Sequence, residues 1–509
     1  MSDYLLAAKD LSDLLLNSIP SETSAEMGDA PDLNQFFVPK SHARALKINV
    51  PIVIGDRGAG KSFWWSRLQS REHRERLEKV APDTRIRANT YVIPGYGMER
   101  TIQGTPSINL YPSENVWRDD LLGRFPARSI WKTIVLWSVD PDSTSTVLPP
   151  GQSWPERVRW LMANTEAADR LIQAKEVELI ASDRDILIVF DALDSITSDP
   201  TQLDDLVEGL AQVALELRSF RKLHAKVFLR SDQFGEQRVG RFADASKLRA
   251  SSIPLSWLPN ELYGLLWHLM SNHPGGGGNN FRLDMYRCLN LAKVEKQKIS
   301  KAQQEDLLKL ENPEDWQLPA EVLFDLKSQE LLFHHLTGPY MGENARKGFP
   351  YRWLPTHLAD AHGLITPRSF LMALRRAAED TKDMNSGCEY AVDYRYLHAG
   401  VRSASAVRVD EIAEHPWVLP LMNPLRGALL IPFEFEQVEP IWMGNRTLDH
   451  ESVTMAKLVT PDLARQALVQ LGIFRPMRTG RIDVPDIYRL GFGLRRKGGV
   501  SLAKMGERR

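Results

Sequence analysis

A stretch of twelve residues near the beginning of the chain places glycine, lysine and serine at a spacing suited to phosphate binding. It reads Pro51-Ile-Val-Ile-Gly-Asp-Arg-Gly-Ala-Gly-Lys-Ser62. Glycines let a backbone wrap closely around phosphates, and the amide groups of such a loop and of the next helix point at the anion. At this spacing Lys61 would contact the β- and γ-phosphates, and the hydroxyl of Ser62 would bind Mg²⁺. We therefore predict a nucleotide-binding loop formed by Gly55, Arg57, Gly58, Ala59, Gly60, Lys61, Ser62 and Phe63.

A carboxylate follows an apolar run farther along the chain. Residues 186–190 (Ile-Leu-Ile-Val-Phe) are apolar throughout, as expected for a central parallel strand that is covered on both faces, and Asp191 comes next. A carboxylate at the end of such a strand can hold the water shell of Mg²⁺. Asp191 is therefore predicted as a catalytic residue and, with Ser62, as a metal ligand. Asp194 has two interpretations, since it either polarises the attacking water or caps the next segment.

Two arginines are further candidates for the nucleotide site. Residues 226–232 (Lys-Val-Phe-Leu-Arg-Ser-Asp) predict a strand beside the 186–190 strand, with Arg230 and Asp232 at the same edge of the sheet. Arg230 either senses the γ-phosphate as a catalytic residue or pairs internally with Asp232. Arg368 falls in the first turn of a helix that Thr366 caps and Pro367 opens, where a cation is unfavourable. It faces either the nucleotide or solvent.

The elements that must position these residues predict an α/β fold. A strand precedes the glycine loop, a helix runs from Phe63 to about Lys79, and Trp64 and Trp65 within it are interpreted as core. A helix around residues 203–221 joins the next two strands, which gives a right-handed strand–helix–strand unit. We expect a central parallel sheet flanked by helices. Residues beyond Pro259 are predicted to be mainly helical.

The ends of the chain have distinct patterns. Tyr4, Ala8, Leu11 and Leu15 predict an amphipathic helix before Pro20, which packs either on its own domain or on a partner. Near the other end, a helix from Thr460 to Leu471 precedes a hairpin around Thr479 and Gly480, and a last helix is expected from Pro485 to about Leu494. Together these elements predict a winged-helix-like module that contacts either DNA or protein.

Composition sets limits on the class of protein. The chain has 509 residues, 64 Lys and Arg against 65 Asp and Glu, and two cysteines, Cys288 and Cys388. A reducing cytosol fits this cysteine use, and neither a secretion signal nor a membrane-spanning run is expected. Residues 461–509 hold 11 basic against 4 acidic residues, a net charge of +7. This basic end is a candidate contact for nucleic acid or for an acidic partner.

The predicted division of the chain has five parts. They are an N-terminal helix and linker (1–40), a nucleotide-binding core with an insertion at about 80–180 (41–258), a helical lid (259–380), a helical connector (381–450) and a basic winged-helix-like domain (451–509).

The chain resembles bacterial P-loop ATPases of the additional-strand class, near the AAA+, KAP and STAND groups. The resemblance rests on four segments in this order along the chain: the glycine loop, residues 185–194, residues 228–232 and Pro367-Arg368-Ser369. The resemblance covers roughly residues 45–380. It implies ATP with Mg²⁺ bound through Gly58, Gly60, Lys61, Ser62 and Asp191, and a helical lid over the nucleotide. It also implies ATP-dependent oligomerisation, in which Arg346 or Arg368 reaches a neighbour's site.

Two departures from this family qualify the expected activity. Ala192 follows Asp191 where AAA+ proteins usually have a second acid, so slow hydrolysis is expected. The interval from Lys61 to Asp191 is also long for AAA+ proteins. We expect an ATP-driven switch located in the cytoplasm. The resemblance implies a role in phage defence or in DNA transactions, in which prokaryotic proteins of these groups often act. A DNA-binding regulator that uses ATP as an effector, and a phosphotransferase, are the alternatives.

Overall fold

The computed structural model describes residues 5–20, 33, 36–98, 101–102, 105–106, 110–139, 153–197, 199–234, 246, 250–274, 276–292, 318–498 and 500–502. Two compact units divide the chain. We call residues 25–256 the sheet unit, and residues 1–24 together with 257–509 the helical unit. Each is described separately.

The sheet unit is built on a five-stranded sheet in the order β2-β5-β6-β1-β7, in which every neighbouring pair is parallel. The strands are β1 (Ile52–Ile54), β2 (Tyr91–Tyr96), β5 (Ile186–Phe190), β6 (Leu223–Leu229) and β7 (Ser252–Pro254). Every residue of β5 is buried, as its continuous apolar sequence predicts. The predicted strand beside β5 is confirmed as β6, which lies between β5 and β1.

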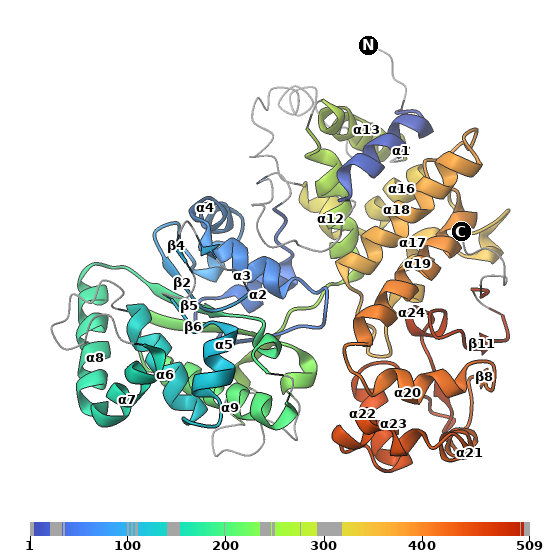
Figure 1. Ribbon diagram of the computed structural model, residues 1–509. Helices are drawn as coiled ribbons and strands as arrows, with labels where there is room; N and C mark the ends of the chain where they lie inside the picture. Colours follow the sequence, from blue (N-terminus) through green and yellow to red (C-terminus); the bar gives the residue numbers. More distant parts are fainter. Residues whose placement is uncertain are drawn as a thin grey trace. The chain divides into compact units, whose positions relative to one another are not determined.

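Helices cover both faces of this sheet (Figure 1). One face carries α2 (Lys40–Leu46), α3 (Lys61–Gln69) and α4 (Arg71–Val80), and the other carries α6 (Ala127–Val139) and α9 (Pro200–Leu217). The remaining elements are β3 (Thr101–Ile102), β4 (Thr105–Pro106), α5 (Glu114–Val116), α7 (Trp154–Ala163) and α8 (Thr165–Ala181). The predicted α/β fold class is confirmed. The segment 80–180 contributes β2 and α6 to the sheet core.

The helix predicted from Phe63 to about Lys79 is two helices. Ser70 has extended backbone angles, and its side chain caps α4 by accepting a hydrogen bond from the amide of His73. Serine is a favoured helix cap, so a new helix starts there. Trp64 and Trp65 of α3 are buried, as predicted. Gly97 permits this packing, because a Cβ at Gly97 would lie 2.2 Å from the ring of Trp65.

A buried lysine fastens the segment that leads into β1. The ammonium of Lys226, in β6, donates hydrogen bonds to the backbone carbonyls of Ala45, Lys47 and Val50 over 3.1, 3.0 and 2.9 Å. Burial lowers the pKa of Lys226 to about 7. Three carbonyl acceptors favour the charged form, so the ammonium fixes this connection to the sheet.

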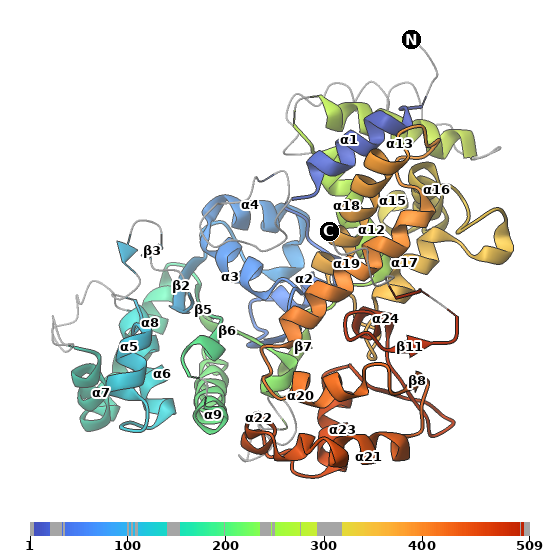
Figure 2. The same cartoon turned by 45° about the vertical axis from the view of Figure 1, so that its right-hand side comes forward.

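The helical unit begins with a bundle to which the N-terminal helix belongs (Figure 2). Its helices are α1 (Ala8–Ser18), α12 (Pro259–Ser271), α13 (Gly277–Ala292), α15 (Ala320–Phe324), α16 (Leu326–Thr337), α17 (Pro350–Leu358), α18 (Pro367–Met384) and α19 (Tyr394–Ile412). Helix α1 packs against α18, and Arg375 of α18 donates hydrogen bonds to the carbonyls of Leu16 and Ile19. The N-terminal helix thus packs within its own chain.

The last part of the helical unit contains short elements. They are α20 (Val418–Met422), β8 (Leu430–Ile431), α21 (Val438–Gly444), α22 (Glu451–Met455), α23 (Pro461–Gln470), β9 (Arg475–Pro476), β10 (Ile482–Asp483), α24 (Asp486–Arg489) and β11 (Arg495–Arg496). Thr460 caps α23, and β9 and β10 form the predicted hairpin with Gly480 at a φ of 84°. The helix expected through Leu494 is wrong, because α24 ends at Arg489 before two glycines. Gly493 is left-handed, and β11 pairs with β8.

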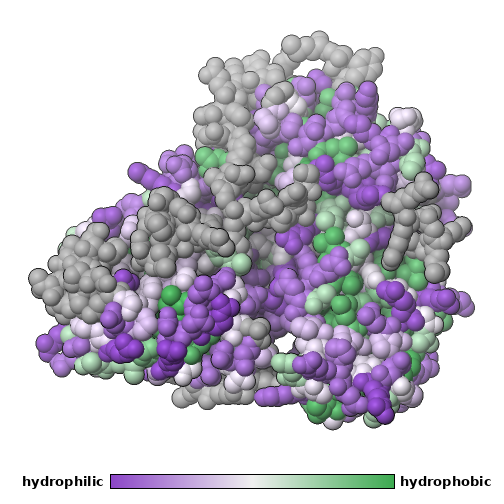
Figure 3. Space-filling model, in the orientation of Figure 1, coloured by the Kyte–Doolittle hydropathy of each residue, from purple (hydrophilic) through white to green (hydrophobic). Residues whose placement is uncertain are grey.

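The surface of the helical unit is mixed. On the face shown in Figure 3, hydrophobic patches over the C-terminal helices are separated by hydrophilic residues. The helical unit also has single exposed apolar side chains, such as Met384 and Met455, which is usual for folded proteins. Among the described residues, no helix has both the length and the apolar character needed to cross a membrane.

Candidate nucleotide site

The glycine loop occupies the turn between β1 and α3. Gly58 and Gly60 have φ values of 72° and 105°, in the left-handed region that favours glycine, and Gly60 is the N-cap of α3. The amide of Gly55 donates a hydrogen bond over 2.9 Å to the carbonyl of Leu229 in β6, which ties the loop to the sheet. The sequence therefore forms the strand–loop–helix arrangement that its spacing predicts.

Lys61 stands at the first position of α3, with its side chain folded over the loop. Its ammonium donates hydrogen bonds to the carbonyls of Gly55 and Asp56 over 2.8 and 2.9 Å. Burial lowers the pKa of Lys61, while the carboxylate of Asp191 opposes that shift. A half-buried ammonium at a helix N-terminus is suited to binding a phosphate group.

The two predicted metal ligands are in contact. The hydroxyl of Ser62 donates a hydrogen bond to the carboxylate of Asp191 over 2.6 Å. Asp191 is only 4% exposed, and burial raises the pKa of its carboxyl group while the bond from Ser62 and the charge of Lys61 lower it. One hydroxyl and one carboxylate oxygen beside a phosphate cradle fit Mg²⁺, which takes few protein ligands when phosphates supply others. The residues therefore fit ATP with Mg²⁺.

Asp194 lies between two arginines. Arg230 donates a hydrogen bond to its carboxylate over 3.1 Å, and the guanidinium of Arg57 lies 3.8 Å from the same oxygen. Arg230 also binds Asp232 through two nitrogens, at 2.9 and 3.1 Å. The internal Arg230–Asp232 pair is thus present, and Arg230 reaches Asp194 as well. The structure therefore brings Arg57, a residue of the glycine loop, together with the predicted acid Asp194 and the predicted γ-phosphate sensor Arg230.

Sequence reasoning did not identify several residues that shape this site. The hydroxyl of Ser231 donates to the carboxylate of Asp56. Ala192, the residue after Asp191, adopts a φ of 56°. The hydroxyl of Ser195 lies 2.8 Å from the carbonyl oxygen of Ala192 and 3.0 Å from the hydroxyl of Tyr96. Burial raises the pKa of Tyr96 to about 12. The contacts of Ser231 with Asp56 and of Ser195 with Tyr96 join loops that are distant in sequence, so no local sequence pattern predicts them.

Two predicted residues are placed differently from the rest. The ring of Phe63 packs on Phe36 and Trp64, at centroid distances of 6.2 and 5.3 Å, so only its backbone is suited to the loop. Arg368 belongs to the helical unit, where it pairs with Glu411 of α19. Contact between Arg368 and a nucleotide stays a prediction.

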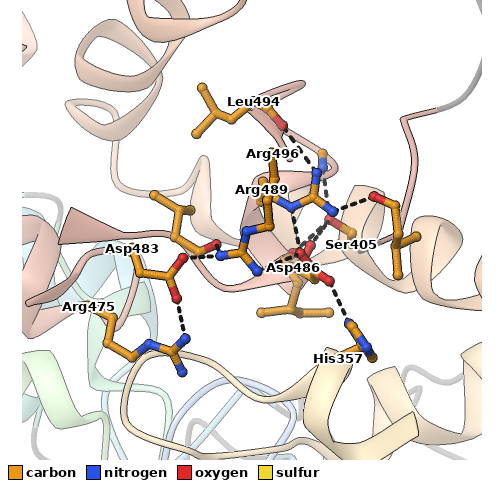
Figure 4. Close-up of polar contacts among 12 residues, drawn as sticks. His357, Ser405, Arg475, Asp483, Asp486, Arg489, Leu494 and Arg496 are labelled. Atoms are coloured by element: carbon orange, nitrogen blue, oxygen red, sulfur yellow. Dashed lines mark hydrogen bonds and ion pairs between the residues drawn. The ribbon is translucent and has the colours of Figure 1, made fainter. Parts of the chain in front are cut away.

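A buried ion-pair network holds the basic C-terminal segment (Figure 4). Arg489 donates to Asp486 over 2.5 Å and to the carbonyls of Leu494 and Val500, while His357 of α17 lies 2.5 Å from Asp486. Burial opposes ionisation, but the bonds from His357 and Arg489 bring the pKa of Asp486 to about 2. The segment after α24 is therefore fastened to the helical unit.

The same network removes much of the predicted basic surface. Arg475 and Arg496 pair with Asp483, and Arg481 pairs with Glu434. Within the described part of this segment, the exposed cations for which the structure gives no ion pair are Arg478, Arg495 and Lys497. Arg496 is thus a structural residue rather than part of a free basic run.

Comparisons with known proteins add little. No protein-family model matches the chain, and no curated protein matches it. Two solved structures align over most of their length, both at 11% identity and a TM-score of 0.28. Cdc6p from Pyrobaculum aerophilum is matched over 93% of this chain and 93% of that chain, and the Aeropyrum pernix ORC2 protein, solved as ADPNP and ADP complexes, over 91% and 93%. Identity and TM-score are too low to transfer either protein's ligand to this chain.

Proposed function

We propose that the chain binds ATP with Mg²⁺ at the β1–α3 loop and hydrolyses it slowly, as a molecular switch. The observation that carries this proposal is the 2.6 Å contact between Ser62 and Asp191, made beside the half-buried side chain of Lys61. A phosphate-binding loop alone would fit any anion. The added carboxylate selects an anion that arrives with a divalent cation.

Each residue has a distinct role in this proposal. The amides of residues 57–62 and the start of α3 bind the phosphates, and Lys61 moves from the carbonyls of Gly55 and Asp56 to the β- and γ-phosphate oxygens. Ser62 and Asp191 would hold Mg²⁺, whose charge would offset that of the phosphates. In hydrolysis the oxygen of water would bond to the γ-phosphorus, the bond from the γ-phosphorus to the β,γ-bridging oxygen would break, and ADP, inorganic phosphate and a proton would be released.

Asp194 is the acid best placed to accept the proton of that water. In the structure its carboxylate accepts a hydrogen bond from Arg230 and lies near the guanidinium of Arg57. A γ-phosphate is a stronger anionic partner for both arginines, so its arrival would free the Asp194 carboxylate. Catalysis would then depend on the bound triphosphate. Because Ala192 occupies the position after Asp191, no second acid lies directly beside it, which fits slow turnover.

The switch requires two states with different ATP contacts. In our proposal ATP orders the helical region after Pro259 as a lid and favours assembly with further copies or a partner protein. Arg346 is the better candidate for reaching a neighbour's nucleotide, because it is exposed and the structure gives it no ion pair among the described residues. Arg368 is already paired with Glu411.

Binding of a fluorescent ATP analogue tests the first step. The wild-type chain should bind it more tightly with Mg²⁺ than with EDTA, and Lys61→Ala should abolish binding. Asp191→Asn should remove the Mg²⁺ dependence, because an amide is a weaker ligand for a hard cation. Binding that is equal in all three proteins would reject the site.

A second candidate function is an ATP-regulated DNA-binding protein that uses residues 451–509. The observation that favours it is the exposure of Arg478, at the tip of the β9–β10 hairpin, and of Arg495 and Lys497. These three cations can contact phosphates, which gives affinity without sequence specificity. A salt titration of DNA binding tests this function.

A further inference from the structure

The helical unit contains a cavity that the proposed nucleotide chemistry does not use. It lies between the segment after α16 and the segment that joins α18 to α19, and its volume is about 540 Å³. Small-molecule sites commonly fall in this range of volumes. We call it the tyrosine cavity, since its lining includes Tyr340, Tyr390 and Tyr394, together with Glu343 and Glu389.

The walls of the tyrosine cavity are fixed by specific contacts. The amide of Val392 donates to the carbonyl of Leu336 over 3.0 Å, which joins the two segments. Gly338 has a φ of 77°, and a Cβ there would lie 2.9 Å from the ring of Tyr390. Asp393 caps α19 and accepts a hydrogen bond from Asn385 over 3.0 Å. The shape is therefore built into the fold.

The lining carries uncompensated negative charge. Its one cation, Arg395, binds both carboxylate oxygens of Asp393, so the pair is neutral. Glu343 and Glu389 are exposed, and the structure gives them no ion pair within the described residues. Lys347 lies near Gly342 but is not part of the lining. Two carboxylates of the lining are therefore exposed to solvent, and neither has an ion pair in the part of the chain that the structure describes.

The tyrosines add a second form of attraction for a cation. Aromatic rings attract a positive charge through their faces, and the attraction grows when the cation is partly desolvated. The structure gives no hydrogen bond to another described residue for the hydroxyls of Tyr340, Tyr390 and Tyr394. Burial raises the pKa of Tyr390, and the charge of Glu389 adds to that shift.

We propose that the tyrosine cavity binds an organic cation, a guanidinium or alkylammonium group on a carbon frame. The three aromatic side chains cover the apolar part of such a ligand, and Glu343 and Glu389 balance its charge. The group arrives either as a free small molecule or as a side chain of a protein segment. This site uses none of the residues assigned to ATP.

Ligand-observed NMR on the full chain tests this proposal with choline and 3,3-dimethylbutan-1-ol, which have similar shapes and differ in charge. Choline should bind at least about fivefold more tightly than the neutral alcohol. N-acetylarginine amide, tested in parallel, identifies the source. Tighter binding of the arginine derivative indicates a protein side chain, and tighter binding of choline a free cation.

Variants separate the tyrosine cavity from general electrostatic attraction. Glu343→Gln with Glu389→Gln, and separately Tyr390→Leu, should each weaken cation binding about tenfold, whereas Tyr390→Phe keeps the ring and should retain it. Glu436→Gln with Glu439→Gln, two exposed charges elsewhere in the helical unit, is the matched control and should change nothing. Equal binding of choline and the alcohol, no binding of either cation, or equal loss in the control would overturn the proposal.

Discussion

The hydroxyl of Ser62 and the carboxylate of Asp191 are joined by a 2.6 Å hydrogen bond, although 129 residues separate them in the sequence. The contact exists because β1 and β5 are parallel strands of one sheet, with β6 between them, so their C-terminal ends open on the same edge. Ligands of open α/β sheets bind at such edges. The position of this pair is the basis of the proposed ATP site.

Replacing Asp194 tests whether it is a base or only a cap. If it accepts the proton of water, Asp194→Asn should lower kcat for ATP hydrolysis by about 100-fold or more, with little change in ATP affinity. Phosphate release and analogue binding, measured on the same protein, separate these effects. Asp205→Asn, an exposed acid on α9, is the control. Wild-type turnover in Asp194→Asn would leave Asp194 with only the structural role of binding Arg230, because Asp199 caps α9.

Acid should weaken the sheet unit through His42. Burial lowers the pKa of His42 from 6.5 to about 3, although a backbone hydrogen bond with Ser256 opposes the shift, and its Nδ1 accepts a hydrogen bond from Trp64. Between pH 6.5 and 3 the unfolded chain therefore binds a proton that the folded chain does not. The free energy of unfolding should be fully retained above pH 6.5 and fall by about 1–2 kcal/mol by pH 5.

Urea unfolding at a series of pH values measures this effect of His42. Other groups titrate over the same range, so the relevant quantity is the difference between the wild type and His42→Gln. Glutamine keeps an acceptor for Trp64 but does not titrate. The difference in the free energy of unfolding between the two proteins should become smaller as the pH falls from 6.5 to 5. A difference independent of pH would show that His42 takes up a proton in the folded chain as readily as in the unfolded chain.

A mixing experiment tests whether Arg346 acts on a neighbouring copy. Lys61→Ala should lack ATP binding but keep Arg346, and Arg346→Ala should bind ATP but hydrolyse it poorly. Mixed oligomers would combine one intact loop with one intact arginine, so mixing should restore part of the turnover. An arginine in trans contributes large factors in related phosphoryl-transfer chemistry. Simple averaging of the two activities would reject this role for Arg346.

DNA binding, if present, should depend on three cations. Changing Arg478, Arg495 and Lys497 to alanine should weaken binding and reduce the slope of log affinity against log salt by about 2–3. Fluorescence anisotropy with a labelled duplex measures both. The matched control is Arg118→Ala, Arg124→Ala and Arg170→Ala, whose side chains are 66, 65 and 75% exposed in the sheet unit. If both triple variants weaken DNA binding equally, binding depends only on the overall charge of the protein and not on the three C-terminal cations.

The sequence predicts the α/β fold and the contacts of the nucleotide loop because both depend on local patterns. A glycine spacing and a fully apolar strand are enough to place Lys61, Ser62 and Asp191. The pairing of Arg57 with Asp194 was not predictable, because it depends on side chains from two loops. The sequence predicts the C-terminal helix too long, since α24 ends at Arg489 and the glycines Gly491 and Gly493 follow. The nucleotide contact of Arg368 remains a prediction.

Steady-state phosphate release from ATP by the purified full chain tests the central claim most directly. The wild type should release phosphate at a slow, Mg²⁺-dependent rate, and both Lys61→Ala and Asp191→Asn should abolish release while folding normally. Added small-molecule phosphate acceptors should leave the rate unchanged, since water is the proposed acceptor. Release that persists in both variants, or a folded wild type that neither binds nor hydrolyses ATP, would contradict the account.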